Sequence, residues 1–293
     1  MRDGYIPGVP CWVDTSQPDP EAAAQFYGGL FGWEFENALP AGSGPSYLIA
    51  RLGDGDVAAI GSAQDQAPPQ ATWNTYIWVT SADKTASKVR EAGGNVVTEP
   101  FDIMNFGRRA VFTDPDGAAF SVWQAKQHKG ANIVNEPGSV NFNDLYTSDP
   151  EGARSFYGSV FGWTTLTLGP GMEAWTLPGY GDHLELDDPD LRKRNAEFGA
   201  PQGFEDVVAT LNPITADRPD TPHWGVTFAV DDADGVAAKT TTLGGEVVVP
   251  PFDAPWVRMT VLRDPSGATS WPASSFRRTP PEEPPVRRQT DRP

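Results

Sequence analysis

Two aspartates lie at matching places near the start of the two halves of the chain and are the residues best suited to chemistry. Asp14 occurs in VPCWVDT (9–15) and Asp144 in SVNFNDLYT (139–147), and both segments are typical of short β-strands. A carboxylate in an apolar cavity has a raised pKa, so it can act as a general base or hold an amine. Asp14 and Asp144 are therefore candidate catalytic residues. A carboxylate that is merely hydrogen-bonded at a strand end fits these positions equally well.

Aromatic side chains follow the aspartates at strand spacing. Side chains alternate across a strand, so every second residue of WNTYIWVT (73–80) lies on one face. Aromatic faces stack on flat conjugated ligands and attract cations by about 0.5–2 kcal/mol per contact. Tryptophans packed into an ordinary core are the alternative. The predicted ligand-binding residues are Trp12, Asp14, Asn74, Tyr76, Trp78, Ser121 and Trp123 in the first half and Phe142, Asp144, Gly225 and Trp271 in the second.

Composition excludes several classes of partner. The 293 residues carry 22 Lys+Arg against 39 Asp+Glu, a net charge of −17. Nucleic acid and anionic membrane surfaces need a basic protein surface, so neither is an expected partner. A cationic or neutral small molecule fits better. Cys11 is the single cysteine, which excludes a disulfide framework and a Cys-x-x-Cys metal or redox pair.

Histidines are too few to form a His-rich metal site in each half. His128 and His183 are expected at the surface. His223 precedes Trp224 in PHWGVTFAV and could share the ligand-binding face by strand alternation. A lone histidine is more often structural than a ligand, and the corresponding residue in the first half is Thr72.

No segment approaches the roughly 18 uninterrupted apolar residues of a membrane span, and the N-terminal residues have no apolar signal core. A cytoplasmic protein is expected. Residues 276–293 are rich in proline and arginine and are predicted to be a disordered tail.

An internal repeat divides the chain into two homologous domains. DPEAAAQFYGGLFGW at 19–33 corresponds to DPEGARSFYGSVFGW at 149–163, and GGNVVTEPFD at 93–102 corresponds to GGEVVVPPFD at 244–253. The domains are predicted at 8–126 and 138–275, with a linker at 127–137. The second domain carries an insertion at 182–206, which contains a short helix closed by Gly199. That insertion is either a flap over the mouth of a pocket or an outer ornament.

Each domain contains two similar sets of elements. In the first, a strand at 9–15 precedes a helix that Asp19 caps, with Pro20 at its first position. Strand-like segments follow at 46–52, 56–62 and 73–80, then a helix at 81–92 that ends at Gly93–Gly94. Strands at 95–98, 108–113 and 118–124 complete the domain, and DPDG forms the last hairpin turn. The pattern predicts two βαβββ units in each domain.

This order of elements, the D-P-x-x-A-x-x-F-Y-x-x-x-F-G-W helix and the D-P-x-G turn resemble the vicinal-oxygen-chelate superfamily. That superfamily includes glyoxalase I, bleomycin-resistance proteins, fosfomycin-resistance enzymes and extradiol dioxygenases. The resemblance is greatest to its tandem two-domain actinobacterial branch. It implies an α+β fold in which each domain's curved mixed sheet surrounds a cavity.

The resemblance also locates the metal ligands of metal-using members. The corresponding positions here hold Trp12, Asn74 and Ser121 in the first domain and Phe142, Gly225 and Trp271 in the second. The remaining ligand position, near 59–62 and 207–210, has no His or Glu. Such residues are poor ligands for divalent metals, so a site without metal or other cofactor is expected.

Three functions remain open. The leading hypothesis is a metal-free binding protein, monomeric or homodimeric, that sequesters or carries an aromatic antibiotic or polyketide-type metabolite, cationic or neutral. The alternative is a metal-independent isomerase, cyclase or oxygenation-type enzyme of secondary metabolism, with Asp14 or Asp144 as base. A glyoxalase-like metal lyase is the third.

Overall fold

A computed structural model of the chain describes residues 5–40, 44–63, 71–169, 171–216 and 220–275. The predicted tail at 276–293 lies outside the described residues. The first half contains β1 (Pro10–Gln17), α1 (Pro20–Phe31), β2 (Glu34–Asn37), β3 (Tyr47–Leu52), β4 (Gly55–Ser62), β5 (Thr72–Trp78), α2 (Ala82–Glu91), β6 (Asn95–Ile103), β7 (Gly107–Thr113) and β8 (Ala119–Ala125).

The second half repeats this series and adds helices in the insertion. Its elements are β9 (Val140–Thr147), α3 (Pro150–Phe161), β10 (Thr164–Gly169), β11 (Met172–Thr176), α4 (Tyr180–Leu184), α5 (Leu191–Phe198), the 3₁₀ helix η1 (Phe204–Asp206), β12 (Val207–Pro213), β13 (His223–Ala229), α6 (Ala233–Thr242), β14 (Glu246–Ala254), β15 (Val257–Arg263) and β16 (Thr269–Ser275). The predicted α+β fold is confirmed.

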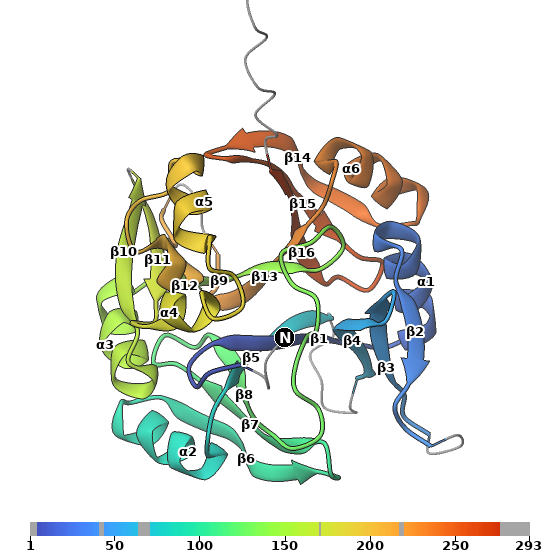
Figure 1. The fold of residues 1–293 in the computed structure, drawn as a ribbon. Coiled ribbons are helices and arrows are strands. Elements are labelled where there is room, and N and C mark those ends of the chain that lie inside the picture. Colours follow the sequence, from blue (N-terminus) through green and yellow to red (C-terminus); the bar gives the residue numbers. More distant parts are fainter. Residues whose placement is uncertain (1–4, 41–43, 64–70, 170, 217–219, 276–293) are drawn as a thin grey trace, which may run out of the picture.

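Each half forms one eight-stranded mixed sheet (Figure 1). The strand orders are β2-β3-β4-β1-β5-β8-β7-β6 and β10-β11-β12-β9-β13-β16-β15-β14. In the first sheet β1 runs parallel to β4 and antiparallel to β5, and β5 runs parallel to β8. The two βαβββ units that the sequence predicts meet at the β1–β5 pair, which the sequence did not predict.

One strand differs from the expectation. The prediction has no strand at β2 and places the strand at 73–80 at the end of the first unit. In the structure β2 is the second strand of the first unit, and β5 opens the second unit. The sequence of β2 is EFEN, and three of its four residues are exposed, so it lacks the buried alternation by which strands are recognised.

The repeated helix is fixed at both ends as its sequence predicts. The Asp19 side chain accepts a hydrogen bond from the Ala22 amide, and Asp149 does the same for Gly152. Gly32 and Gly162 end the helices with φ of 77°, a left-handed conformation that favours glycine. The insertion helix α5 ends at Gly199 as predicted, although its Asp190 makes no side-chain cap bond.

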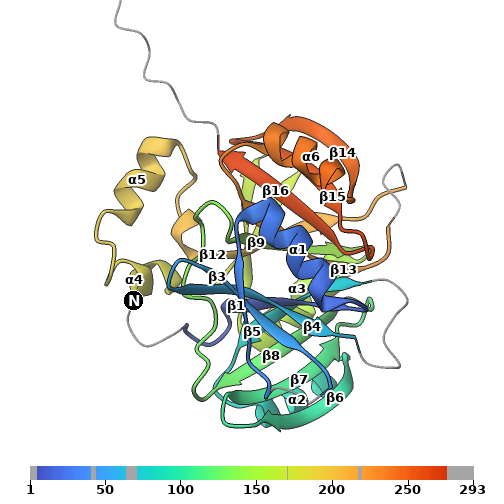
Figure 2. The same cartoon turned by 90° about the vertical axis from the view of Figure 1, so that its right-hand side faces the viewer.

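The hydrophobic cores are shared between the two halves. One core joins Phe26 and Tyr27 of α1 to Val226 and Phe228 of β13, and a second core joins Phe120 of β8 to the residues of α3. Helix α1 packs beside α6, as Figure 2 shows, and α2 packs beside α3. Helices α1, α2, α3 and α6 cover the outer sides of the sheets, which leaves the opposite, inner faces for a site.

Candidate functional site

The first inner face is the side of the first sheet that carries Trp12, Asp14, Asn74, Tyr76, Ser121 and Trp123. Asp14 on β1 is the register partner of Asn74 on β5. Its Oδ1 accepts a hydrogen bond from Asn74 Nδ2 at 2.8 Å, and its Oδ2 accepts from the hydroxyls of Tyr76 at 2.5 Å and Tyr47 at 3.0 Å. Burial raises the pKa of both phenols, so they remain donors. Three neutral donors therefore satisfy the Asp14 carboxylate.

A guanidinium lies on the same face. Arg109 of β7 donates from Nε and Nη2 to the Ser121 hydroxyl at 3.3 and 3.2 Å and lies 4.8 Å from the centre of the Tyr76 ring. Sequence reasoning missed Arg109 and Tyr47. Alternation along 108–113 and 46–52 would have placed both on this face, but without the sheet order nothing in the sequence joins them to Asp14.

The two remaining predicted indoles of the first half have different surroundings. Trp123 lies against Gly107, where an added Cβ would come within 2.3 Å of the indole ring, and its Nε1 donates to the His128 carbonyl oxygen at 2.9 Å. Trp78 is half-buried at the end of β5, 6.1 Å from the Tyr5 ring. Trp12 and Trp123 are only 5% and 7% exposed. The first inner face is therefore closed, although Trp78, Tyr47 and Asn74 at its border are half-buried.

His128 helps to close the first inner face. The prediction that His128 lies exposed is wrong, because its ring packs edge-on against Trp12 at 4.5 Å between centroids and its Nε2 is buried. His183 is half-buried as well. Short polar linkers are usually solvated, so the sequence of this one does not indicate that it folds onto a sheet.

The second inner face is the corresponding side of the second sheet, with Phe142, Asp144, Tyr146, His223, Gly225 and Trp271. Asp144 is buried, and its two oxygens accept hydrogen bonds from the hydroxyls of Thr210 at 2.6 Å and Thr227 at 2.7 Å. Burial raises the pKa of Asp144, an effect that the two threonine hydrogen bonds partly offset. Asp144 is therefore a buried carboxyl group with a raised pKa and hydrogen bonds from two neutral hydroxyls.

Three aromatic rings form a stack beside Asp144. The Tyr146 ring lies 4.6 Å from His223 at an interplanar angle of 9°, and 5.5 Å from Trp271 at 24°. Gly225, the register partner of Asp144, permits this arrangement because a Cβ there would lie 2.7 Å from the Trp271 ring. Phe142 pairs with Thr227 two residues along. The fold thus brings all four predicted residues of the second half onto one face.

His223 belongs to this stack, which the structural interpretation of a lone histidine did not anticipate. Its Nδ1 lies 2.7 Å from the Thr221 carbonyl oxygen, so the tautomer inferred from this bond leaves Nε2 free to accept. Within the described part of the chain, Nε2 has no hydrogen-bond partner. Tyr146 was also missed, although it continues the alternation of Phe142 and Asp144.

Exposure distinguishes the two faces. Phe142, Tyr146, His223 and Trp271 are all half-buried, whereas the indoles of the first inner face are buried. The second inner face therefore presents aromatic surface that a ligand can reach.

The inner faces do not fit a divalent metal. Trp12, Phe142 and Trp271 offer no ligand atom, Gly225 has no side chain, and Asn74 is engaged with Asp14. In the described ranges no group of three or more His, Cys, Asp or Glu side chains is arranged to hold a metal ion.

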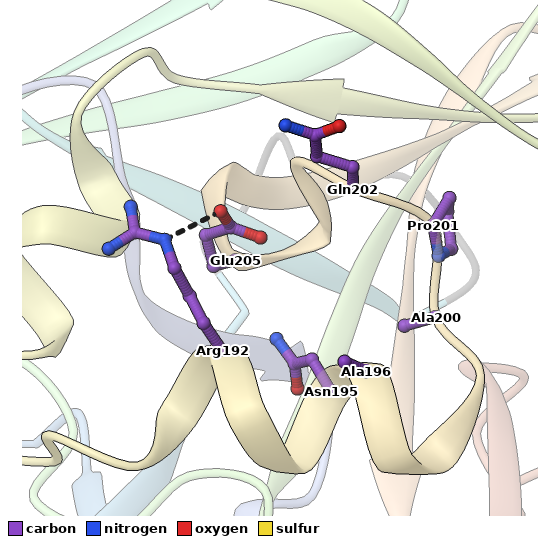
Figure 3. Close-up of a pocket in the computed structure, with 7 residues that line it drawn as sticks. All are labelled: Arg192, Asn195, Ala196, Ala200, Pro201, Gln202 and Glu205. Atoms are coloured by element: carbon purple, nitrogen blue, oxygen red, sulfur yellow. Dashed lines mark hydrogen bonds and ion pairs between the residues drawn. The ribbon is translucent and has the colours of Figure 1, made fainter.

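A surface pocket of about 320 Å³ lies within the insertion (Figure 3). Helix α5 and the segment 200–205 form its walls, and Arg192 Nε donates to Glu205 Oε1 at 2.7 Å across it. Arg192 also pairs with Asp182 and Glu185. Because three carboxylates neutralise this guanidinium, the pocket has no free cation for an anionic ligand.

None of the helices in the described segments combines the length and apolar character needed to cross a bilayer.

The chain is similar to a known protein family and to several curated proteins. The Glyoxalase/Bleomycin resistance protein/Dioxygenase superfamily matches residues 12–122 and 138–270. The putative glyoxylase CFP32 of Mycobacterium bovis is 39% identical over 270 residues, which cover 91% of this chain and 95% of the relative. The anthracycline biosynthesis protein DnrV of Streptomyces peucetius is 34% identical over 277 residues, 90% of this chain and 92% of the relative.

Solved structures share the fold. A Mn(II)-bound glyoxalase from Novosphingobium aromaticivorans superposes with a TM-score of 0.58 at 15% identity, covering 93% of this chain and 84% of that one. The 2,3-dioxygenase LapB from Pseudomonas sp. KL28 gives 0.57 at 13% identity, covering 96% and 97%. At these identities the likeness concerns the fold.

Proposed function

Because the chain belongs to the Glyoxalase/Bleomycin resistance protein/Dioxygenase superfamily, we propose that it binds an aromatic antibiotic or polyketide-type metabolite on the second inner face, without a metal. Its relatives DauV and DnrV are anthracycline biosynthesis proteins, which associates the chain with secondary metabolism. The anthracycline class is therefore the first guest to test.

The observation that carries the proposal is the accessible stack of Tyr146, His223 and Trp271 next to the buried carboxyl group of Asp144. The indole and phenol faces would stack on a flat ring system, with about 0.5–1.5 kcal/mol from each aromatic pair beyond its buried area. Asp144 would accept a hydrogen bond from a hydroxyl or ammonium group of the same guest. The acidic surface, with a net charge of −17, further favours a cation.

Titration with a commercially available anthracycline tests this binding through quenching of tryptophan fluorescence. Saturable binding is expected in the wild type. Trp271→Ala should weaken it about tenfold or more, because it removes the largest ring of the stack. Trp78→Ala is the matched control, since Trp78 is a half-buried indole on the other sheet. No saturable binding, or equal effects of the two substitutions, would contradict the proposal.

A second candidate is a metal-independent enzyme, which the environment of Asp144 favours. Its raised pKa suits a general base, and the unpaired Nε2 of His223 could take or return a proton on the same face. Asp14 suits this role less well, because Asn74, Tyr76 and Tyr47 already occupy its oxygens. Turnover of an aromatic polyketide that disappears in Asp144→Asn but persists in Asp14→Asn would favour the enzyme. Unaltered substrate after long incubation would count against it.

A further inference from the structure

The interdomain linker is fastened across the first inner face. The Lys126 amide donates to the Phe106 carbonyl oxygen at 2.9 Å, the Ala131 amide to Cys11 at 2.9 Å, and the Asn132 amide to Asp56 at 2.7 Å. These acceptors belong to the β6–β7 turn, β1 and β4, so residues 126–132 cross the sheet from one unit to the other (Figure 1). We call this segment the strap.

The strap inserts one aromatic ring into the face. The His128 ring is 4.5 Å from Trp12 and 5.9 Å from Trp123, edge-on to both at 79° and 82°. Its Nε2 is buried and has no hydrogen-bond partner among the described residues, although an unpaired buried polar atom costs about 1–3 kcal/mol. The ring therefore fills the space between two indoles without satisfying its own polar atom there.

The face beneath the strap contains a cation with unused donors. Arg109 directs Nε and Nη2 at a single hydroxyl, that of Ser121, and makes no ion pair with a carboxylate of the described residues. The charge of Asp14 on the same face helps to raise the pKa of Arg109, but the Asp14 oxygens accept their hydrogen bonds from Asn74, Tyr76 and Tyr47 and leave the N–H groups of Arg109 unused. In the second sheet the equivalent register position holds Met259. The two inner faces thus differ in charge.

We propose that the strap competes with ligands for the first inner face, because His128 takes the place of an aromatic ligand there. Release of the strap opens a binding site on this face that selects planar aromatic anions through Arg109. This site on the first inner face does not depend on the binding proposed for the second inner face. Its ligand would lie between Trp12 and Trp123, with its anionic group bound by the free N–H groups of Arg109.

A pair of dyes tests the proposal. 1-Anilinonaphthalene-8-sulfonate is the anionic probe, and N-phenyl-1-naphthylamine has the same rings without the sulfonate. All proteins carry Trp271→Ala, so that the second inner face does not contribute. Adding His128→Ala should tighten binding of the sulfonate at least tenfold, because a closed state no longer competes. Adding Arg109→Met should reverse the gain for the sulfonate and leave binding of the neutral dye unchanged.

His183→Ala in the same background is the matched control, and it should leave both affinities unchanged. Two results overturn the proposal. One is unchanged affinity for the sulfonate in a His128→Ala protein that keeps its circular dichroism and melting temperature. The other is a gain that survives Arg109→Met, since the exposed face would then not select anions.

Hydrogen exchange tests the same proposal with the native strap. The Ala131 and Asn132 amides are bonded to the sheet, so exchange at both should accelerate at least fivefold when the sulfonate saturates the Trp271→Ala protein. The Ala23 amide, bonded to Asp19 in α1, is the internal reference. Unchanged exchange at 131 and 132 under saturation would place the dye elsewhere and overturn the proposal.

Discussion

The hydroxyl of Tyr27 in the first half donates a hydrogen bond of 2.9 Å to Oδ2 of Asp264 in the second half. The reciprocal pair, Tyr157 and Asp114, is joined at 3.0 Å. Each aspartate uses its Oδ1 to hold the backbone of its own hairpin turn, as the D-P-x-G motif predicts. The repeated helix of each half thus forms a polar contact with the repeated turn of the other half. Tyr27 and Tyr157 also belong to the two hydrophobic cores that the halves share.

Removal of one such hydroxyl should destabilise the whole chain. Tyr27→Phe leaves the buried Trp73 Nε1 without its acceptor and removes one of the two donors to Asp264 Oδ2, which keeps only its hydrogen bond from Gln17 Nε2. The expected loss is about 1–3 kcal/mol of the free energy of unfolding. Urea unfolding followed by tryptophan fluorescence measures it. Tyr180→Phe is the control, because the Tyr180 hydroxyl has no hydrogen bond among the described residues. Equal stability of the two variants would show that the contact between the halves contributes little.

Separated halves should not fold. Residues 1–126 would expose the surface of α1 that packs on α6, and residues 138–275 would expose the surface of α3 that packs on α2. Each fragment alone should lack a cooperative thermal transition, and mixing the fragments should restore one. Circular dichroism during heating provides the measurement. A cooperative transition in either isolated fragment would contradict this expectation.

The second glycine of each repeated G-G pair should resist substitution. A Cβ on Gly245 would come within 2.7 Å of the Phe26 ring in the other half, and one on Gly94 would lie equally close to Phe156. Gly245→Ala should therefore cost about 1–3 kcal/mol through overpacking. Gly169→Ala, where a Cβ meets nothing within 4 Å, should have little effect. Thermal unfolding of both variants measures the difference in stability. It tests whether the close packing of the two halves requires glycine at position 245.

Asp144→Asn and Asp14→Asn should change stability in opposite directions. Folding raises the pKa of Asp144 because burial disfavours its charged form, so at neutral pH the ionised group opposes folding. Asp144→Asn should raise the free energy of unfolding at pH 7 by about 1 kcal/mol. Asp14→Asn should lower it by about 1–3 kcal/mol, because the tyrosine hydroxyls lose a carboxylate acceptor.

The pH profile checks the sign for Asp144. Stability of the wild type relative to Asp144→Asn should improve as the pH falls through the raised pKa of Asp144. The advantage of the variant should disappear below the usual value of 3.8, where the carboxyl group is protonated in both the folded and unfolded states. Chemical denaturation across this pH range measures it. An advantage independent of pH would indicate a cause other than the buried charge.

The amino-acid sequence by itself determined the repeat, the helix caps, the D-P-x-G turns and the order of most strands. These features depend on local chemistry: Asp19 bonds an amide three residues away, and Gly32 needs only its own left-handed backbone. Alternation placed Asp14 with Trp12 and Asp144 with Phe142, and the family resemblance added Asn74 and Gly225 to the same faces, where they are the register partners of the two aspartates. Strand β2, which was missed, is polar and mostly exposed, so its residues do not alternate between apolar and polar as those of a half-buried strand do.

Tertiary structure alone decided how the two similar faces differ. Tyr47 and Arg109 reach the first inner face from strands far from Asp14 in the sequence, and the partners of Tyr27 and Gly245 lie in the other half of the chain. Tertiary packing likewise determined that the His128 ring is buried. A polar linker carries no periodic signal, and only the space between Trp12 and Trp123 makes burial of the His128 ring favourable. Local patterns record what each residue prefers, whereas the folded sheets determine which residues meet.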